Sequence, residues 1–378
     1  MSVWRLLPSL CVALASLPAS AQVVWQLIDA SGDGAGNALT GARGIALDRQ
    51  GNVFVAGVTS QNVFRIAPDG KIVQVIGPDG DGAGNELREP RGLAVDAKGN
   101  LYVGGIGSGN VFQVTPDGKK RQVIGPSGDG RGNALHRPIA LAVDGQGNLF
   151  VAGSGSRNVL KRTPQGKLTA VIEGHGAGPG QELRRPNGLA VDKHGNVYVV
   201  GAKSRNAFKI EPSGKITQLV DAKGAGDGKR LEFPNGIDVD DAGNVYVSGN
   251  NSGNVLKITA TGEISEIMGP RDPKLGVLLG GPTAVAVDRQ GNVFVTRGGA
   301  LSVYLITPQG AIQRLLDERG DNRGHPLKWA GAVEVDAQGD VFVAGSGSNN
   351  LFRIVPPGPR REALLEAQRA ATRAPQPE

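Results

Sequence analysis

The sequence predicts an all-β fold, a seven-bladed β-propeller with four antiparallel strands in each blade. Three observations predict it. One short phrase recurs every 48 residues, Gly accounts for 59 of the 378 residues, and aromatic residues make up only 4% of the chain. A fixed period of this length is typical of supersecondary units that bury their faces against their neighbours. Abundant Gly and scarce aromatic residues suit short strands joined by tight turns.

The repeated phrase has the pattern Asp-x-x-Gly-Asn-(Val/Leu)-(Phe/Tyr)-Val. Its first residue, the anchor aspartate, is Asp48, Asp96, Asp144, Asp192, Asp240, Asp288 and Asp336. The phrase is interpreted as a hairpin turn followed by a strand, because Gly supplies a positive φ and Asp accepts hydrogen bonds from turn amides. The aromatic residue and the Val after it are predicted to pack in the core between blades.

The second unit shows how four strands fit into one period. The strands are predicted at residues 91–95, 101–103, 110–114 and 121–124. A Gly-containing turn precedes the second strand and another precedes the fourth, as hairpin connections require. Four antiparallel strands joined in this way form one propeller blade.

The two ends of the repeat region predict how the ring closes. The last unit supplies three strands and stops near Val355, where the Pro-rich residues 356–359 prevent continuation. Residues 23–28 match the fourth-strand segment 72–76 one period later. The N-terminal strand is therefore expected to complete the last blade, so that no sheet edge stays open at the seam.

The segments before and after the repeats lack the repeated phrase and are predicted to have other roles. Residues 1–21 resemble a secretory signal peptide, with Arg5, an apolar run and the small-x-small site Ala19-Ser20-Ala21. This predicts a secreted or periplasmic protein with cleavage after Ala21. The propeller is assigned to residues 22–358, and residues 359–378 form a short helical or disordered tail.

The amino-acid composition limits the chemistry and the kinds of binding partner that are expected. The only Cys, Cys11, lies in the predicted signal peptide, so disulfides and thiol chemistry are not expected. The formal net charge of +6 is mild for a chain of this size, and a nucleic-acid partner is not expected. No later apolar run reaches the length of a transmembrane helix. The protein is expected to be a monomer.

The inter-blade phrase from Gly80 to Asp96, followed by Gly-Asn-Leu-Tyr-Val, resembles the NHL repeat, and similar phrases cover almost the whole repeat region. The resemblance implies a propeller. It departs from the family in having seven copies, where six blades are common, and in lacking the usual acidic residue after the second strand. Members of that family and their relatives bind proteins or RNA, or carry metal-dependent lyase or lactonase chemistry, so the fold does not choose among these functions.

The acidic residues of the repeats can be interpreted as metal ligands or as residues that stabilise turns. The anchor aspartates each begin a turn, which accounts for all seven without a metal. Further acids occur in Gly-rich loops between blades, at Asp33, Asp81, Asp129 and Asp321, where calcium is an alternative with an incomplete ligand set. The four His residues are His136, His175, His194 and His325, and their spacing predicts no zinc site. No cofactor is expected.

Differences between the copies point to a site. Two residues before the anchor, five units have Ala, whereas the fifth and seventh have Asp238 and Glu334. Acids at this crowded position are costly, and we expect them to be paired, with Arg43 and Arg91 as candidate partners.

The predicted first residues of the innermost strands also differ between copies. Arg43, Arg91, Asn187 and Asn235 should surround one end of the channel. Asn187 and Asn235 lie in Pro-Asn-Gly, similar to the phrase that supplies a metal ligand in gluconolactonase-type propellers, although Asn-Gly is also a common turn. The two Arg residues are suited to a carboxylate or sugar acid, or to pairing with the acids. Trp329 is suited to stacking on a sugar, or to packing in the blade that carries the seam.

These observations predict a non-catalytic scaffold that binds a protein, carbohydrate or small molecule at the channel face. One alternative is a metal-dependent lyase or lactonase with its site in the channel, for which Asp238, Glu334, Asn187 and Asn235 are the candidate ligands. Another is a purely structural protein of the cell envelope. The shortage of His and the near-identity of the copies disfavour the enzyme.

Overall fold

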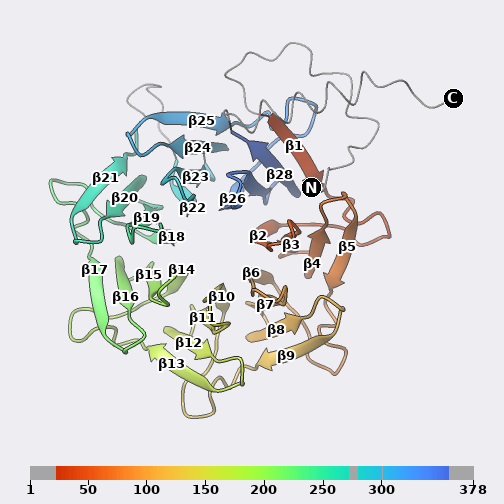
Figure 1. Ribbon diagram of the computed structural model, residues 1–378, viewed down its shortest axis with the longest axis horizontal. Coiled ribbons are helices and arrows are strands. Elements are labelled where there is room, and N and C mark those ends of the chain that lie inside the picture. Colours follow the sequence, from red (N-terminus) through yellow and green to blue (C-terminus); the bar gives the residue numbers. More distant parts are fainter. Residues whose placement is uncertain (1–22, 272–279, 300, 357–378) are drawn as a thin grey trace.

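The structure is a ring of seven four-stranded antiparallel sheets, as the sequence predicts (Figure 1). The computed structural model describes residues 23–271, 280–299 and 301–356. The predicted signal peptide at 1–21 and the tail at 359–378 lie outside the described residues. Within those residues no helix is long and apolar enough to cross a membrane.

Each of the first six blades consists of four consecutive strands. Blade one contains β2 (Ala42–Leu47), β3 (Val53–Gly57), β4 (Asn62–Ile66) and β5 (Ile72–Ile76), and blade two contains β6 (Pro90–Val95), β7 (Leu101–Gly105), β8 (Asn110–Val114) and β9 (Lys120–Ile124). Blade three contains β10 (Pro138–Val143), β11 (Leu149–Gly153), β12 (Asn158–Arg162) and β13 (Leu168–Ile172). Blade four contains β14 (Pro186–Val191), β15 (Val197–Gly201), β16 (Asn206–Ile210) and β17 (Ile216–Val220).

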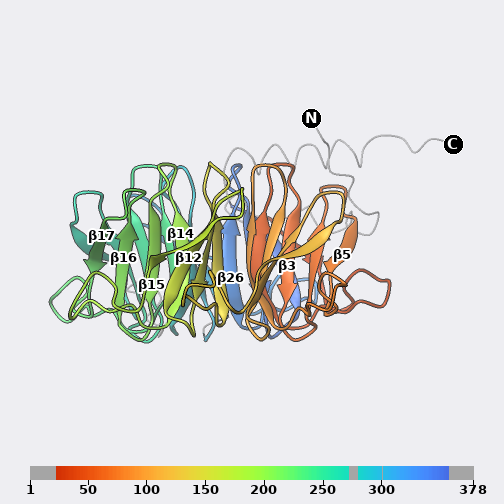
Figure 2. The same cartoon turned by 90° about the horizontal axis from the view of Figure 1, so that it is seen from below.

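The remaining blades follow the same order. Blade five contains β18 (Pro234–Val239), β19 (Val245–Gly249), β20 (Asn254–Ile258) and β21 (Ile264–Met268), and blade six contains β22 (Pro282–Val287), β23 (Val293–Arg297), β24 (Ser302–Ile306) and β25 (Ile312–Leu316). Blade seven contains β26 (Ala330–Val335), β27 (Val341–Gly345), β28 (Asn350–Val355) and, from the other end of the chain, β1 (Val23–Ile28). The first strand of every blade lies innermost, and the loops gather on the two faces of the disc (Figure 2).

The N-terminal strand closes the ring. β1 pairs antiparallel with β28, with Val24 opposite Ile354 and Gln26 opposite Phe352. Val23 and Ile28 are buried, so this strand adds to the core as well as covering the edge of β28. The prediction that this segment completes the last blade is confirmed.

The repeated aromatic residue and the Val after it face opposite neighbours. Phe54 packs with Leu93 and Val103 of the second blade, whereas Val55 packs with Phe342 of the seventh. All seven equivalents of Val55 have no exposed surface. Successive side chains of a strand point to opposite faces of its sheet, so one phrase supplies the contacts to both neighbouring blades.

The seventh copy departs from the repeated phrase, because Asp340 stands where the other copies have Asn. Asp340 has no exposed surface and forms a buried ion pair with Arg353 of β28, whose Nε lies 2.8 Å from Oδ2. The guanidinium carbon of Arg353 also lies 5.7 Å from the ring centre of Trp25 in β1. This ion pair therefore belongs to the seam that closes the ring, and the sequence pattern alone did not single it out.

Candidate functional site

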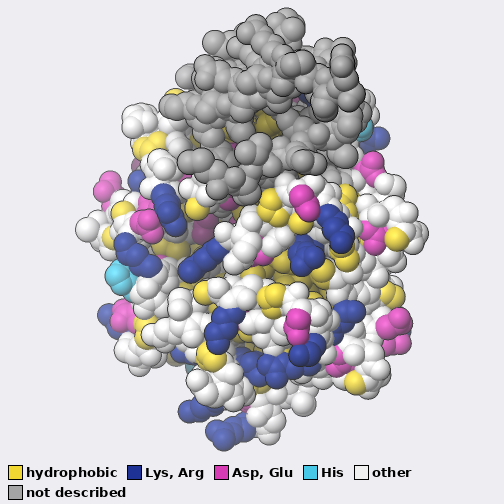
Figure 3. All heavy atoms as spheres, turned by 45° about the vertical axis from the view of Figure 1, so that its right-hand side comes forward, with side chains coloured by type: hydrophobic (Ala, Val, Ile, Leu, Met, Phe, Trp, Pro, Cys, Tyr) yellow, Lys and Arg dark blue, Asp and Glu magenta, His cyan; other side chains and the backbone are white. Residues whose placement is uncertain are grey.

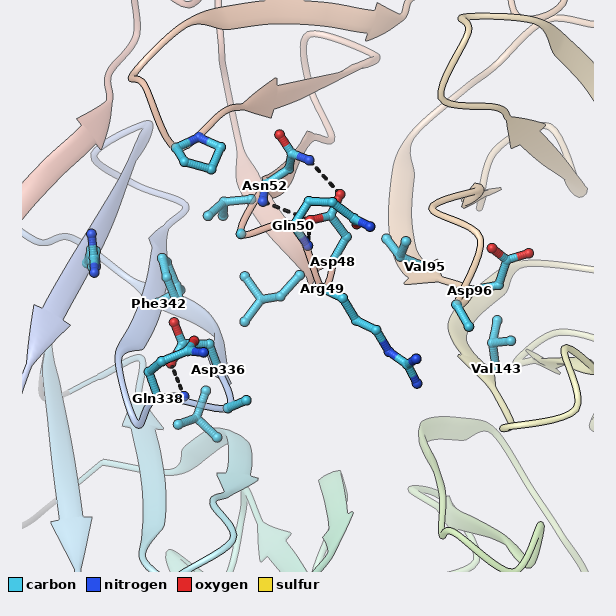
Figure 4. Close-up of a pocket in the computed structure, with 18 of the residues that line it drawn as sticks. Asp48, Arg49, Gln50, Asn52, Val95, Asp96, Val143, Asp336, Gln338 and Phe342 are labelled. Atoms are coloured by element: carbon cyan, nitrogen blue, oxygen red, sulfur yellow. Dashed lines mark hydrogen bonds between the residues drawn. The ribbon is translucent and has the colours of Figure 1, made fainter. Parts of the chain in front are cut away.

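The central channel has two chemically different ends. At the end where the inner strands finish, which we call the turn end, a cavity of about 820 Å³ is lined by turn residues of blades one, two, three and seven, including Asp48, Asp96, Asp144 and Asp336 (Figure 4). Figure 4 shows Arg49 extending into this space. The other end, where the inner strands begin, is the channel mouth.

The anchor carboxylates at the turn end are engaged by their own turns. Asp48 Oδ1 accepts hydrogen bonds from the amides of Gln50 and Asn52 at 2.9 and 2.8 Å, and Oδ2 accepts one from Asn52 Nδ2 at 2.6 Å. In the second blade Tyr102 donates a further hydrogen bond to Asp96 Oδ2 at 3.3 Å. Saturated acceptors of this kind are turn elements, so they are poorly disposed to ligate a metal.

The acids of the Gly-rich loops behave similarly. Asp33 Oδ2 accepts hydrogen bonds from Asn37 Nδ2 at 2.8 Å and from the amide of Gln74 at 3.4 Å. In the seventh copy, His325 Nδ1 lies 2.7 Å from Asp321 Oδ2, so His325 takes the place of the loop Asn. No group of three or more His, Cys, Asp or Glu side chains within the described ranges is placed to hold a metal ion.

Glycine brings the inner strands together at the mouth. A Cβ on Gly44 would lie 2.0 Å from the carbonyl oxygen of Arg91 in the next blade, and one on Gly188 would lie 2.6 Å from that of Asn235. Only a residue without a side chain fits such a close backbone approach. The residues one position earlier therefore converge on a narrow opening.

A cavity of about 360 Å³ lies on one side of this mouth. Its lining contains three of the predicted site residues, Arg43, Arg91 and Trp329, together with Arg137 and Glu89. Trp329 is 64% exposed and is the one exposed large hydrophobic residue in the described part of the chain. The structure thus brings these three predicted residues together and adds two more.

The mouth is electropositive. Burial, together with the smaller effects of the charges of Arg43, Arg185 and Arg137, lowers the pKa of Arg91 to about 10. Within the described residues, none of the three arginines that line the cavity forms a salt bridge. Arg185 lies farther round the rim, with its guanidinium carbon 5.0 Å from the ring centre of Phe233.

Several large side chains at the mouth sit on a strained backbone. The residue directly before each inner strand is called the rim position. Five of the seven rim residues are non-Gly residues with positive φ, namely Glu89, Arg137, Arg185, Phe233 and Trp329, with φ between 50° and 55°. Left-handed backbone costs a non-Gly residue about 1–2 kcal/mol. Gly41 occupies the same position in the first blade with φ of 68°, so glycine also satisfies this turn.

From the sequence, Trp329 is the one residue at the rim position that is predicted to belong to the site. Arg137 and Arg185 were missed, although their spacing of 48 residues from Glu89 and from each other is visible in the chain. The missing signal was the left-handed backbone at the rim position, and of these two arginines Arg137 lines the cavity whereas Arg185 lies against Phe233.

The two predicted asparagines share one hydrogen bond, and the buried Oδ1 of Asn187 accepts none among the described residues. Asn187 Nδ2 donates a hydrogen bond of 2.7 Å to Asn235 Oδ1 across neighbouring inner strands. Neither residue lines the cavity that contains Arg91 and Trp329. A metal on Asn235 Oδ1 would have to displace this hydrogen bond.

Asp238 and Glu334 lie deeper than the arginines, three residues farther along their inner strands, or roughly 10 Å at the rise of a strand. The expected pairing with Arg43 or Arg91 is not found. Instead Asp238 Oδ2 accepts a hydrogen bond from the amide of Val287 in the next blade at 2.8 Å, and Oδ1 accepts one from the amide of Val239 at 2.9 Å. The arginines begin their strands and the acids stand near the ends of theirs, which explains the separation.

Glu334 has a different environment. Removal from bulk water raises the pKa of its carboxyl to about 8, with a smaller contribution from the charge of Asp238. The side chain is nevertheless solvent-exposed, which places it against water inside the channel. Burial likewise raises the pKa of Asp238, to about 6, against the lowering effect of its two backbone hydrogen bonds.

The outer surface shows no single basic stripe on the face drawn in Figure 3. There the Lys and Arg side chains, in dark blue, are interspersed with magenta Asp and Glu among neutral side chains and backbone.

Comparison with known proteins supports the fold. A family model described as a beta-propeller repeat matches residues 34–65 and 215–257. The chain is a β-propeller built from repeated blades. These matches are consistent with the NHL-like propellers that the repeated phrase resembles. No curated protein sequence matches the chain.

Solved structures share the architecture at low sequence identity. Virginiamycin B lyase from Staphylococcus aureus has 16% identity and a TM-score of 0.68, over 88% of this chain and 99% of that chain. The WD40 propeller domain of Doa1 has 13% identity and a TM-score of 0.61, over 90% and 97%. A lactonase-like protein has 14% identity and a TM-score of 0.50, over 89% and 92%. At this identity the likeness concerns the fold alone, and these relatives differ in function.

Proposed function

We propose that this propeller is a non-catalytic binding scaffold that holds its ligand at the channel mouth. The observation that carries the proposal is the cavity of about 360 Å³ in which three arginines without salt-bridge partners in the described part of the chain meet an exposed tryptophan. Its size falls in the range of small-molecule sites. Aromatic and Arg side chains are also the residues that most often dominate binding energy.

The alternative, a metal-dependent lyase or lactonase, has less support from the geometry. Both carboxylate oxygens of Asp238 accept backbone hydrogen bonds, and Asn235 accepts one from Asn187. A metal on these residues would have to replace those contacts. Asn187 Oδ1 and the carboxylate of Glu334 are the candidate ligand groups for which the described structure shows no competing hydrogen bond, and one amide oxygen with one carboxylate is too few for a tight site.

The experiment is a glycan and metabolite array probed with the wild type and with Trp329→Ala. The proposal predicts that the strongest signals fall by at least about fivefold in the variant, the loss expected for an aromatic anchor. Asp69→Ala, on an outer turn, is the control and should keep them. Signals that survive Trp329→Ala but vanish in Asp69→Ala would place binding on the outer rim and contradict the proposal.

Elemental analysis of the purified protein addresses the alternative separately. A metal present at one equivalent, and lost in a Glu334→Gln variant, would favour the enzyme. The proposed scaffold predicts no such equivalent.

A further inference from the structure

We infer that the ligand of the channel mouth is an acidic sugar, whose carboxylate is held by Arg43, Arg91 and Arg137 while its ring lies on Trp329. This inference rests on the proposed function and names the ligand class of the same site.

The arginines supply the recognition of the acid group. A guanidinium presents its donors in a planar fork that matches a carboxylate in a bidentate arrangement. Arg43, Arg91 and Arg137 line one cavity, and none of them has a salt-bridge partner among the described residues. Three like charges around one cavity repel one another, and an anion between them removes that repulsion.

Two backbone features indicate that these side chains are kept for a purpose other than folding. Arg137 and Trp329 both occupy the rim position with positive φ, 55° and 54°, where Gly41 serves in the first blade. Trp329 is also 64% exposed, so it gains little from burial to offset its backbone strain. Strain of this kind, about 1–3 kcal/mol for each residue, clusters at ligand-binding positions.

The rest of the lining favours a sugar over an inorganic anion or a phosphate ester. Thr59, Ser346 and Glu89 also line the cavity, and the Ser346 hydroxyl, which donates to the Trp329 carbonyl at 2.9 Å, can still accept a hydrogen bond. Sugar hydroxyls can pair with all three, whereas a doubly charged phosphate would be repelled by Glu89. The exposed face of an indole ring suits the apolar face of a pyranose. A volume of about 360 Å³, equal to that of roughly a dozen water molecules, accommodates one or two sugar rings.

The protein allows a direct spectroscopic test. It has three Trp residues, so Trp4→Phe with Trp25→Phe leaves Trp329 as the only one in the intact chain. This double variant is titrated with D-glucuronate and D-glucose, which differ only in having a carboxylate or a hydroxymethyl group at one carbon, while Trp329 fluorescence is recorded. We expect a saturable change with glucuronate and binding at least about tenfold weaker with glucose, the scale of one lost charge-assisted interaction.

Matched arginine variants locate the acid group. In the same background, Arg91→Ala should weaken glucuronate binding at least about fivefold. Arg49→Ala removes the same side chain from the cavity at the turn end and should leave affinity unchanged. Raising NaCl from about 0.05 to 0.5 M should weaken glucuronate binding several-fold, because salt screens the interaction.

The outcomes separate this inference from the proposed function. Equal binding of glucose and glucuronate, weakened by Trp329→Ala, would overturn the acid but keep the mouth as the binding surface. Sulfate or phosphate binding as tightly as glucuronate would overturn the sugar. No response to glucuronate up to about 10 mM, where even a millimolar Kd would be visible, would overturn the inference and leave the array result standing. Loss of binding in Arg49→Ala with Arg91→Ala silent would defeat both.

Discussion

The two ends of the channel are built from the same seven inner strands, yet their side chains are used in opposite ways. At the turn end, the anchor aspartates recur in all blades and accept hydrogen bonds within their own turns, as Asp48 does from Gln50 and Asn52. At the mouth, the residues differ from blade to blade, and Arg43, Arg91 and Arg137 have no salt-bridge partner in the described ranges. The larger cavity is at the turn end, whereas the smaller cavity at the mouth groups three arginines with an exposed tryptophan.

This difference shows how a repeat protein separates stability from function. Uniform residues pair with partners inside their own repeat, so each copy contributes the same stabilising contacts. A single ligand site has to break the symmetry, and we propose that it does so at the mouth, where the copies diverge.

The largest expected effect on stability comes from a substitution at the turn end. Asp340→Ala leaves the buried guanidinium of Arg353 without its carboxylate, and removing one partner of a buried ion pair costs about 3–5 kcal/mol. We expect a strongly lowered unfolding free energy in urea. Asp340→Asn is the matched variant, because Asn is the residue at this place in the other six blades, and it should cost less than Ala. Equal losses in both variants would show that the charge of Asp340 is what matters at the seam.

A second prediction concerns the closure of the propeller ring by the N-terminal strand. Removal of residues 23–28 takes two buried side chains, Val23 and Ile28, out of the core and exposes the edge of β28. Each fully buried aliphatic side chain contributes about 1.5–3 kcal/mol, so a loss of roughly 3 kcal/mol or more is expected. Thermal melting of the shortened chain measures it, and an unchanged melting temperature would contradict closure by β1.

The rim position permits a sharper contrast between the two ends. Trp329→Gly relieves a left-handed backbone while removing an exposed side chain, so stability should stay the same or rise by up to about 1 kcal/mol. Array signals should nevertheless be lost. A variant that loses stability along with binding would mean that Trp329 supports the seventh blade instead of a ligand.

The smallest effect is expected for Glu334, because its side chain is exposed and water in the channel screens its charge, and this effect depends on pH. In the folded protein the pKa of Glu334 is raised from its ordinary 4.5 to about 8, so between these values the native state holds a proton that the unfolded chain releases. Stability from this group is therefore present below about pH 4.5 and lost as pH rises through about 8. Glu334→Gln should be more stable than the wild type at pH 8, and the difference should shrink towards pH 4.5. Melting temperatures that differ equally at both values would show that the carboxyl titrates normally.

Much of the fold could be predicted because the information is local and repeated. The period gave the number of blades, and the likeness of residues 23–28 to 72–76 predicted the closing strand, because both segments must end a blade. The anchor turns followed from the known behaviour of Asp and Gly in hairpins.

The site could be predicted only in part. The sequence singled out Arg43, Arg91 and Trp329, which the structure places around one cavity. Arg137 also lines the cavity, from a position with left-handed backbone. A sequence pattern does not reveal that backbone conformation. The prediction that Asp238 pairs with an arginine was wrong for a similar reason. Its carboxylate accepts a hydrogen bond from the amide of Val287 in the next blade, and the sequence of one repeat does not show which backbone amides of the neighbouring blade lie close to it.

One strand, β6, carries both kinds of residue and permits the most direct test. Arg91 lies near its start at the mouth, and Asp96 directly follows its end. Asp96 accepts hydrogen bonds from the amides of Lys98 and Asn100, both at 2.9 Å, and from Asn100 Nδ2 at 2.8 Å.

The decisive measurement is the unfolding free energy of Asp96→Ala and Arg91→Ala, taken side by side in urea. The account predicts that Asp96→Ala lowers it by about 1–3 kcal/mol, because buried and turn donors lose their acceptor. Arg91→Ala should change it by no more than about 0.5 kcal/mol, because the arginine has no salt-bridge partner in the described structure to lose and is repelled by its neighbours. If Arg91→Ala destabilises the protein as much as Asp96→Ala does, the mouth arginines are part of the framework and the separation of stability from function is wrong.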